Sequence, residues 1–267
     1  TKLNKDIDLN ISTFHSYFFT ILRLFPQYIG FDKGIQVLDE EDKKQVIKQI
    51  IKEHKIKMDD KDLITYISKI KNHVDYDPLS VEEQIHLNKT FIEYQETLRR
   101  YNKLDFDDIL YYFKDLLDSS SFRREELQNE CKYILVDECQ DTNKIQYEII
   151  KILSQKHQNL YMVGDPDQLI YTFRGSNIDN INDFILNEKA TVIKLEENYR
   201  STTSILSAAN SVINKNTNRV DKTLYTNNTI NDIQVIYRNL NNNYDEAQYL
   251  RLLIQKLINQ GYQYKDM

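Results

Sequence analysis

Two polar clusters each follow a short apolar run, and their residues are the ones in this sequence best suited to chemistry. Asp137 and Glu138 come directly after the apolar residues 133–136, and the apolar run 160–163 leads into segment 164–168, which carries two aspartates and a glutamine. Short apolar runs separated by a helical pattern predict a strand–helix–strand unit of a parallel sheet. Ligands of such sheets bind beyond the carboxyl ends of the strands. These acids are therefore expected at the edge of the sheet where a metal ion bound to a phosphate would lie.

The adjacent carboxylates Asp137 and Glu138 suit magnesium-dependent hydrolysis. Mg²⁺ takes one or two carboxylates together with waters and substrate phosphates. One acid would hold the metal and its water shell, and its neighbour would orient and deprotonate a hydrolytic water. An Asp–Glu pair by itself is more often two solvated acids at the end of a strand, so the pair alone does not decide the function.

Aromatic residues follow the second cluster. Tyr171 and Phe173 lie two positions apart on a segment that is expected to be extended, so their rings face the same way. Two rings beside Arg174 make a stacking platform for unpaired bases, which contributes roughly 1–3 kcal/mol per base. Composition alone favours the other interpretation, in which both rings belong to the core.

Composition limits the class of protein. The 267 residues suffice for one large or two modest domains, and the net charge of −6 argues against nucleic-acid binding through bulk charge, so any such site must be a local groove. Two cysteines without C-x-x-C spacing indicate neither a disulfide framework nor a zinc site. The sequence shows no signal peptide and no run of 18 apolar residues, so a cytoplasmic protein without membrane segments is expected.

The elements that must position these residues alternate between α/β and all-helical patterns. Three helices are predicted between residues 39 and 104, without an intervening strand pattern, and Ser80–Glu83 is a capping box for the third. We interpret this region as an all-helical subdomain inserted into an α/β domain. Further strands are predicted at 9–13, 191–195 and 233–237, and further helices at 15–25, from 104 to a linker-like segment at 118–121, at 203–214 and at 245–260, with Gly261 at C′.

Several ordered segments resemble the motifs of superfamily 1A DNA helicases of the UvrD/PcrA/Rep type. The resemblance is carried by residues 136–143, 163–175 and 195–202, by an earlier motif at 13–16, and by segments 104–110 and 208–219. The segments cover nearly the whole chain, and four motifs in the right order and spacing form a specific signal. One departure is Cys139, which replaces the aromatic residue usual at that position.

The resemblance implies roles for individual residues around ATP. Asp137 would bind magnesium, and Glu138 would activate the water that attacks ATP. Gln168 would contact the γ-phosphate or its water. Tyr199 would stack near adenine, and Arg200 would reach the γ-phosphate as an arginine finger.

The resemblance also implies a DNA-binding set. Tyr171, Phe173 and Arg174 would contact single-stranded DNA, and Thr13 and His15 would lie beside it. A capping or core position explains His15 equally well.

The fold that the resemblance implies is α/β, with a RecA-like parallel sheet, an inserted all-helical subdomain and the start of a second RecA-like domain. We expect residues 1–38 and 105–201 to form the two parts of the first RecA-like domain, 39–104 the helical insertion, and 202–267 the beginning of the second domain. The phosphate loop of the family, with its lysine, and the later motifs are not found in this sequence, so the chain is expected to be a fragment.

The implied function is ATP-dependent 3′→5′ translocation on single-stranded DNA with duplex unwinding, using ATP and Mg²⁺. The expected partners are single-stranded DNA and single/double-strand junctions, with unidentified accessory repair or replication proteins and no membrane. Two alternatives stay open. A subunit of a RecB/AddA-type helicase–nuclease would show a nuclease motif further along its gene. An inert DNA-binding or scaffolding relative that kept the fold would be disfavoured by an intact phosphate loop upstream.

We predict negligible ATPase activity for residues 1–267 alone, because the phosphate-loop amides and lysine that hold the nucleotide are missing. A phosphate-release assay with and without single-stranded DNA checks this, and robust DNA-stimulated turnover would contradict it.

Overall fold

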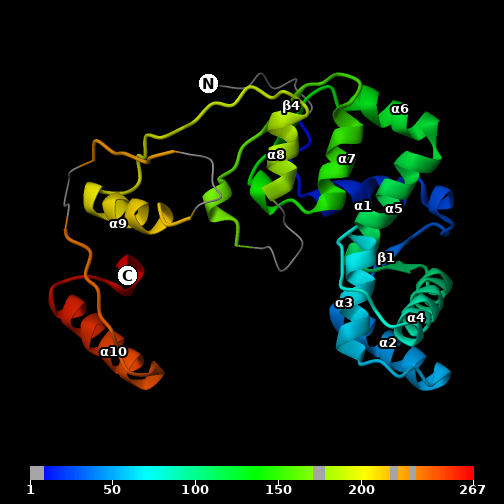
Figure 1. The fold of residues 1–267 in the computed structure, drawn as a ribbon, viewed down its shortest axis with the longest axis horizontal. Helices are drawn as coiled ribbons and strands as arrows, with labels where there is room; N and C mark the ends of the chain where they lie inside the picture. Colours follow the sequence, from blue (N-terminus) through cyan, green and yellow to red (C-terminus); the bar gives the residue numbers. More distant parts are fainter. Residues whose placement is uncertain (1–8, 171–177, 217–221, 229–232) are drawn as a thin grey trace. The chain divides into compact units, whose positions relative to one another are not determined.

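The structure is a computed structural model that describes residues 9–170, 178–216, 222–228 and 233–267. Two compact units, Thr1–Val192 and Ile193–Met267, make up the chain, and each is described by itself. Figure 1 follows the chain through its elements, of which the helices are long and the strands short.

A parallel strand–helix–strand unit carries the predicted acids. Its elements are β3 (Ile134–Val136), α7 (Lys144–Ser154) and β4 (Leu160–Met162). β3 and β4 pair in parallel with Val136 opposite Met162. The Cys139 N–H extends this pairing beyond β3 by donating to the Val163 carbonyl at 2.9 Å. Ile150 of α7 is buried with Val136 and Cys139 in one apolar cluster. The prediction of this unit is confirmed.

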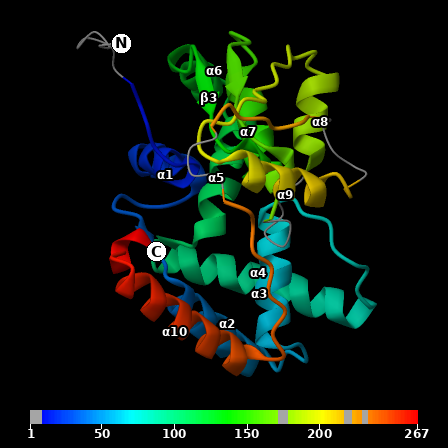
Figure 2. The ribbon, with the colours of Figure 1, turned by 90° about the vertical axis from the view of Figure 1, so that its left-hand side faces the viewer.

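The central helix of the first unit is α5, which packs against four other helices. The elements are α1 (Phe14–Leu24), α5 (Phe106–Ser119) and α6 (Ser121–Glu130). Figures 1 and 2 both show α5 beside α1 and α7. The rings of Phe18 and Phe113 stack with centroids 4.2 Å apart, and Leu116 and Leu117 are fully buried. This core holds α1, α5 and α6 together against α7, since apolar burial is the main favourable term in folding.

Segment 118–121, predicted as linker-like, joins two helices without a linker. Ser120 ends α5 and is also the N-cap of α6, where its Oγ accepts a hydrogen bond from the Arg123 N–H at 3.3 Å. Serine is favoured at turns and helix caps for the same reason, because its hydroxyl bonds to nearby backbone groups.

The three helices predicted between residues 39 and 104 are present and share an apolar core. The helical cluster consists of α2 (Glu40–His54), α3 (Asp60–Lys71) and α4 (Val81–Arg100). Ile47, Leu63 and Leu87 are fully buried between them. The predicted Ser80–Glu83 capping box is present. Short strands β1 (Gln36–Val37) and β2 (Lys103–Leu104) pair in parallel where the chain enters and leaves the cluster. The three helices lie together in both ribbon views (Figure 2).

The three further predicted strands are wrong for the described residues. In segment 9–13, Thr13 instead caps α1, because its hydroxyl accepts the Ser16 N–H at 3.3 Å. Segments 191–195 and 233–237 contain exposed apolar residues without strand pairing, such as Leu195 at 78% exposure. An apolar alternating run becomes a strand only beside a hydrogen-bonded neighbour. In the described part of the second unit, the only ladder contact is the single bridge from Glu197 to Tyr225.

The second unit contains the two predicted helices, α9 (Thr203–Ile213) and α10 (Asn243–Asn259). Thr202 is the N-cap of α9. Gly261 follows α10 with φ +98°, and this confirms its predicted C′ position, where the left-handed backbone favours glycine.

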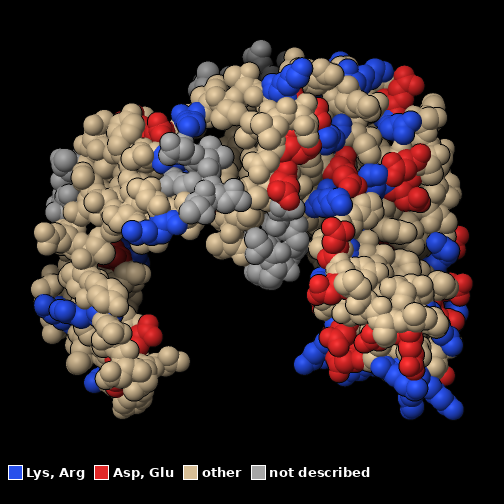
Figure 3. Space-filling model, in the orientation of Figure 1, with Lys and Arg blue, Asp and Glu red and all other residues tan. Residues whose placement is uncertain are grey.

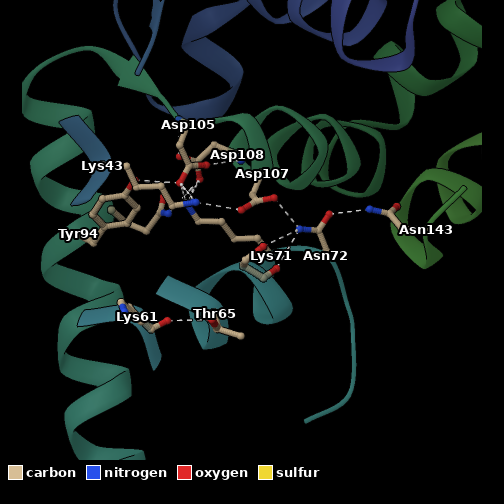
Figure 4. Close-up of polar contacts among 12 residues, drawn as sticks. Lys43, Lys61, Thr65, Lys71, Asn72, Tyr94, Asp105, Asp107, Asp108 and Asn143 are labelled. Carbon is tan, nitrogen blue, oxygen red and sulfur yellow. Dashed lines mark hydrogen bonds and ion pairs between the residues drawn. The ribbon is translucent and has the colours of Figure 1, made fainter. Parts of the chain in front are cut away.

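A buried charge cluster joins the helical cluster to α5. It comprises Lys43, Lys71, Asp105, Asp107 and Asp108 (Figure 4). The Lys71 ammonium is fully buried and lies 2.9 Å from Asp105 Oδ2 and 2.7 Å from Asp108 Oδ1. Lys43 Nζ lies 3.3 Å from Asp105 Oδ2 and 3.1 Å from Asp107 Oδ2. Each of these carboxylates therefore faces at least one lysine, which buried charges require.

The pKa values of the two fully buried aspartates, Asp105 and Asp108, shift in opposite directions. Burial alone would raise the pKa of Asp105, but the charges of Lys71 and Lys43 outweigh it and hold that pKa below its usual value. Burial, and then the negative charge of Asp105, raise the pKa of Asp108 to about 6. The Tyr94 hydroxyl donates to Asp105 Oδ2 at 2.9 Å and supplies a further hydrogen bond. Lys71 pairs with both of these aspartates and is therefore the central cation of the cluster.

We predict that Lys71→Met lowers the free energy of unfolding by about 3–5 kcal/mol, because it leaves Asp105 and Asp108 buried without their shared cation. Urea unfolding followed by circular dichroism measures the change. The matched control is Lys48→Met, whose side chain is 59% exposed and 3.6 Å from Asp60. An exposed pair of this kind contributes about 0–1 kcal/mol. Equal losses in the two variants would contradict the prediction.

Candidate functional site

The predicted acids occupy a strained turn directly after β3. Asp137 and Glu138 are both exposed, and the Glu138 N–H donates to Asp137 Oδ1 at 3.0 Å. Glu138 has φ 49° and ψ 45°, in the left-handed region. That conformation costs roughly 1–2 kcal/mol for a residue with a Cβ. It turns the chain into the 3-10 turn η2 (Cys139–Asp141), so that two carboxylates are presented at the end of the strand.

Gln140 connects this turn to the segment after β4. Its Nε2 donates to Glu138 Oε2 at 2.8 Å, and its Oε1 accepts the Asp165 N–H at 2.9 Å. The side chain is buried, with 2% exposure. Gly164 permits this approach: a Cβ there would lie 2.5 Å from Gln140 Oε1 and 2.6 Å from Cys139 Sγ. The two strand ends are therefore held together by a buried amide.

Asp165 then organises the segment that contains Gln168. Its Oδ1 accepts the Asp167 N–H and its Oδ2 accepts from Gln168 Nε2, both at 2.9 Å. These bonds cap the 3-10 turn η3 (Pro166–Gln168). The prediction that the chain is extended directly after the second strand is therefore wrong for residues 166–168, because an aspartate before a proline favours a turn.

The structure brings three of the predicted nucleotide residues to one edge. Asp137 and Glu138 follow β3, Gln168 follows the neighbouring parallel strand β4, and Gln140 and Asp165 link the two segments. Neither linking residue was assigned a role from the sequence. The Asp165–Pro166 pair is a turn signal, but the partner of Gln140 lies 25 positions away and appears only once the strands pair.

Cys139, the departure from the family pattern, is a packing residue. Its side chain is 5% exposed and belongs to the apolar cluster with Val136 and Ile150. Burial raises the pKa of its thiol to about 11. The neutral thiol is a poor nucleophile and a small apolar side chain, so it supports the turn without adding chemistry.

The loop between Glu138 and α7 is held from two sides. Asn143 is the N-cap of α7, and its Nδ2 donates to Asn72 Oδ1 at 2.8 Å (Figure 4). Asn72 Nδ2 donates in turn to Asp107 Oδ1 at 2.7 Å. From α8 (Ile178–Leu186), Asn180 Nδ2 donates to the Thr142 carbonyl at 3.0 Å. The turn after β3 is therefore tied to the buried charge cluster through side-chain amides.

Predicted DNA-binding residues are only partly described. Tyr171, Phe173 and Arg174 lie outside the described residues. Thr13 caps α1, and His15 packs on Phe106 with ring centroids 5.3 Å apart. Burial lowers the pKa of His15, although the Asp107 charge opposes it.

The predicted residues of the second unit are exposed. Tyr199 is 81% exposed, and its hydroxyl donates to Glu197 Oε2 at 2.7 Å. That hydrogen bond raises the pKa of Tyr199. Asn198 Oδ1 accepts the N–H groups of Arg200 and Ser201 at 2.9 and 2.7 Å and fixes the turn before α9. Both Tyr199 and the exposed Arg200 therefore project from an ordered turn.

Charges are mixed over the surface. On the face drawn in Figure 3, lysines and arginines alternate with acidic side chains over the helical cluster. No group of three or more potential metal-ligating side chains occurs in the described part of the chain. Among those same residues, no helix has both the length and the apolar character that a membrane span requires.

Comparison with known proteins covers both units. The profile of the UvrD/REP helicase N-terminal domain matches residues 2–189, and that of the UvrD-like helicase C-terminal domain matches residues 193–267. A probable DNA helicase II homolog from Mycoplasma capricolum subsp. capricolum is 37% identical over 270 residues, which cover 96% of this chain and 37% of the relative. ATP-dependent DNA helicases PcrA from Staphylococcus aureus and Bacillus subtilis are 38% identical, covering 96% and 95% of this chain and 36% of the relatives. The chain thus spans little more than a third of these curated relatives.

We predict that Gly164→Ala destabilises the chain by about 1–3 kcal/mol, the usual cost of overpacking, because the new methyl group would displace Gln140 and Cys139. Thermal unfolding measures the change. The loss should shrink in a Gln140→Ala background, which removes one of the crowded atoms, since contacting residues are energetically coupled. An equal loss in both backgrounds would argue against this contact.

Proposed function

We propose, because this chain belongs to the UvrD/REP helicase family, that it forms part of an ATP-dependent DNA helicase. The names of the relatives as DNA helicase II homolog and ATP-dependent DNA helicase PcrA support this function. The enzyme would couple ATP hydrolysis to 3′→5′ movement on single-stranded DNA and to duplex unwinding at single/double-strand junctions. Its chemistry would take place in the cytoplasm.

The observation that carries the proposal is the hydrogen-bonded link from Glu138 through Gln140 and Asp165 to Gln168. Glu138 would act as general base toward the hydrolytic water, and Gln168 would contact the γ-phosphate or that water. Because the two side chains belong to one bonded assembly, a base and a phosphate-sensing amide would act on the same water.

The residues present fit a magnesium ion. Asp137 is an exposed carboxylate beside a second one, and Mg²⁺ needs only one or two carboxylates when phosphates and waters supply its other ligands. Bound Mg²⁺ would neutralise charge on the phosphates. Asp137 would hold it, leaving Glu138 free to take the proton.

The remaining roles rest on the family's motifs. Tyr199 would stack on adenine and Arg200 would reach the γ-phosphate, and their exposure leaves both side chains accessible to a nucleotide. Tyr171, Phe173 and Arg174 would bind single-stranded DNA by stacking and charge. Thr13 and His15 would border that path, with His15 fixed by Phe106.

We also propose the finer architecture. Residues 1–38 and 105–201 would form the first RecA-like domain, 39–104 a helical subdomain inserted into it, and 202–267 the start of the second RecA-like domain. The separate core of the helical cluster, and the β1–β2 pairing where the chain enters and leaves it, support the insertion.

We predict that Glu138→Gln in the full-length protein lowers DNA-stimulated kcat by about 10²- to 10⁴-fold, because an amide cannot accept the proton from water. Nucleotide binding should persist, since Asp137 and the phosphate contacts stay. Phosphate release with single-stranded DNA and a fluorescent-nucleotide titration measure the two effects. Glu125→Gln is the matched control, as Glu125 is an exposed residue paired with Lys156. Full turnover by Glu138→Gln, or no DNA-stimulated ATPase in the wild-type protein, would overturn the proposal; the second result would favour the inert relative.

A further inference from the structure

The amide of Gln140 is buried and its orientation is fixed by chemistry. The Asp165 backbone N–H lies 2.9 Å from Gln140 Oε1, and a peptide N–H can only donate. The oxygen must therefore face Asp165, which leaves the NH₂ group toward Glu138 Oε2 at 2.8 Å. A flipped amide would lose both hydrogen bonds. Gln140 thus has one donor for the exposed carboxylate and one acceptor for the neighbouring turn.

This donor restrains a side chain that would otherwise be free. Glu138 is exposed, and among the described residues its carboxylate accepts a hydrogen bond only through Oε2. An exposed glutamate samples several rotamers, and fixing it costs conformational entropy. The buried Gln140 side chain restrains the Glu138 carboxylate by binding its Oε2 atom. Oε1 of Glu138 stays available for a water.

The same amide transmits position between the two strand ends. Asp165, whose N–H binds Gln140 Oε1, also holds Gln168 Nε2 through its own Oδ2. Any shift of the η3 turn relative to the η2 turn must therefore stretch a hydrogen bond of Gln140. The close approach that Gly164 permits makes this link short, because a Cβ there would contact Gln140 Oε1 at 2.5 Å.

We propose that Gln140 is a positioning residue for ATP hydrolysis, which orients the Glu138 carboxylate and sets its place relative to Gln168. This inference rests on the proposed function. The side chain of Gln140 is buried and bonded to Glu138 and Asp165, so it acts through Glu138. A misplacement of about 1 Å in a reacting group is enough to lower a rate on the order of 10²-fold.

The test is Gln140→Glu in the full-length protein. The new carboxyl group keeps the acceptor for Asp165 but, when ionised, cannot donate to Glu138 and repels it. We expect DNA-stimulated kcat to fall by about 10- to 10²-fold while the KM for ATP changes by less than about threefold, the pattern of a lost transition-state interaction. The ratio of variant to wild-type rate should rise as the pH is lowered, because the protonated carboxyl group regains a donor.

The matched control is Gln128→Glu. Gln128 is also a buried glutamine of the first unit, with 9% exposure, and its Nε2 donates to the Ile152 carbonyl at 2.6 Å. A structural defect of this kind should lower the melting temperature and leave kcat per folded molecule unchanged. If Gln140→Glu does not fold, Gln140→Met replaces it. The apolar side chain of similar length removes both the donor to Glu138 and the acceptor for Asp165, and the same loss of kcat is expected without recovery at low pH.

A double mutant separates this inference from the function on which it rests. If Gln140 acts through Glu138, the Gln140→Glu change should have little further effect in the Glu138→Gln background. Three outcomes would overturn the inference and leave the helicase proposal standing. The Gln140 variants could keep the wild-type kcat, or lose no more of it than Gln128→Glu does. The loss in Gln140→Glu could also multiply fully with the loss in Glu138→Gln. Turnover by Glu138→Gln alone would overturn both.

Discussion

The parallel pairing of β3 with β4 is the constraint on which the candidate site depends. Because Val136 is opposite Met162, the residues after each strand emerge at the same edge. Parallel strands place their carboxyl ends together, and this brings residues 25 positions apart within hydrogen-bond distance. The strained backbone of Glu138 and the close contact at Gly164 both occur at this edge. Strain of this kind persists only where surrounding structure over-determines it, and the pairing supplies that structure.

The helical cluster meets this edge through polar contacts rather than apolar ones alone. Lys71 forms short, buried ion pairs with Asp105 and Asp108, and Asn72 extends the contact to Asn143, which caps α7 after the turn that carries Glu138. Buried ion pairs add little net stability over apolar packing, but they tolerate few alternative arrangements because an unpaired charge is costly. Lys71 at the end of α3 is therefore tied to Asp108 of α5, and the bond from Asn72 to Asn143 ties the same helix end to the start of α7.

The sequence predicts local features better than those that depend on distant partners. The Ser80–Glu83 capping box, the end of α10 at Gly261 and the two central strands carry their signals within a few residues, and each is confirmed. Segments 191–195 and 233–237 have the same apolar alternation as a strand but no described neighbour to pair with, so their pattern alone misleads. The candidate site likewise has residues that the sequence identifies and residues that only the structure reveals. Asp137, Glu138 and Gln168 stand out by type and position, whereas Gln140 gains its two bonds only after strand pairing.

The hydrogen bond between Asn72 and Asn143 connects the end of α3 to the start of α7. The α3 helix of 12 residues is about 18 Å long at 1.5 Å per residue, and its C-cap is Asn72. Leu63 and Ile67 of α3 are buried in the core of the helical cluster, and Lys71 in its last turn is paired with Asp105. The packing of the whole helix therefore sets where Asn72 meets Asn143, so a change in the core of the helical cluster would be felt at the turn before α7.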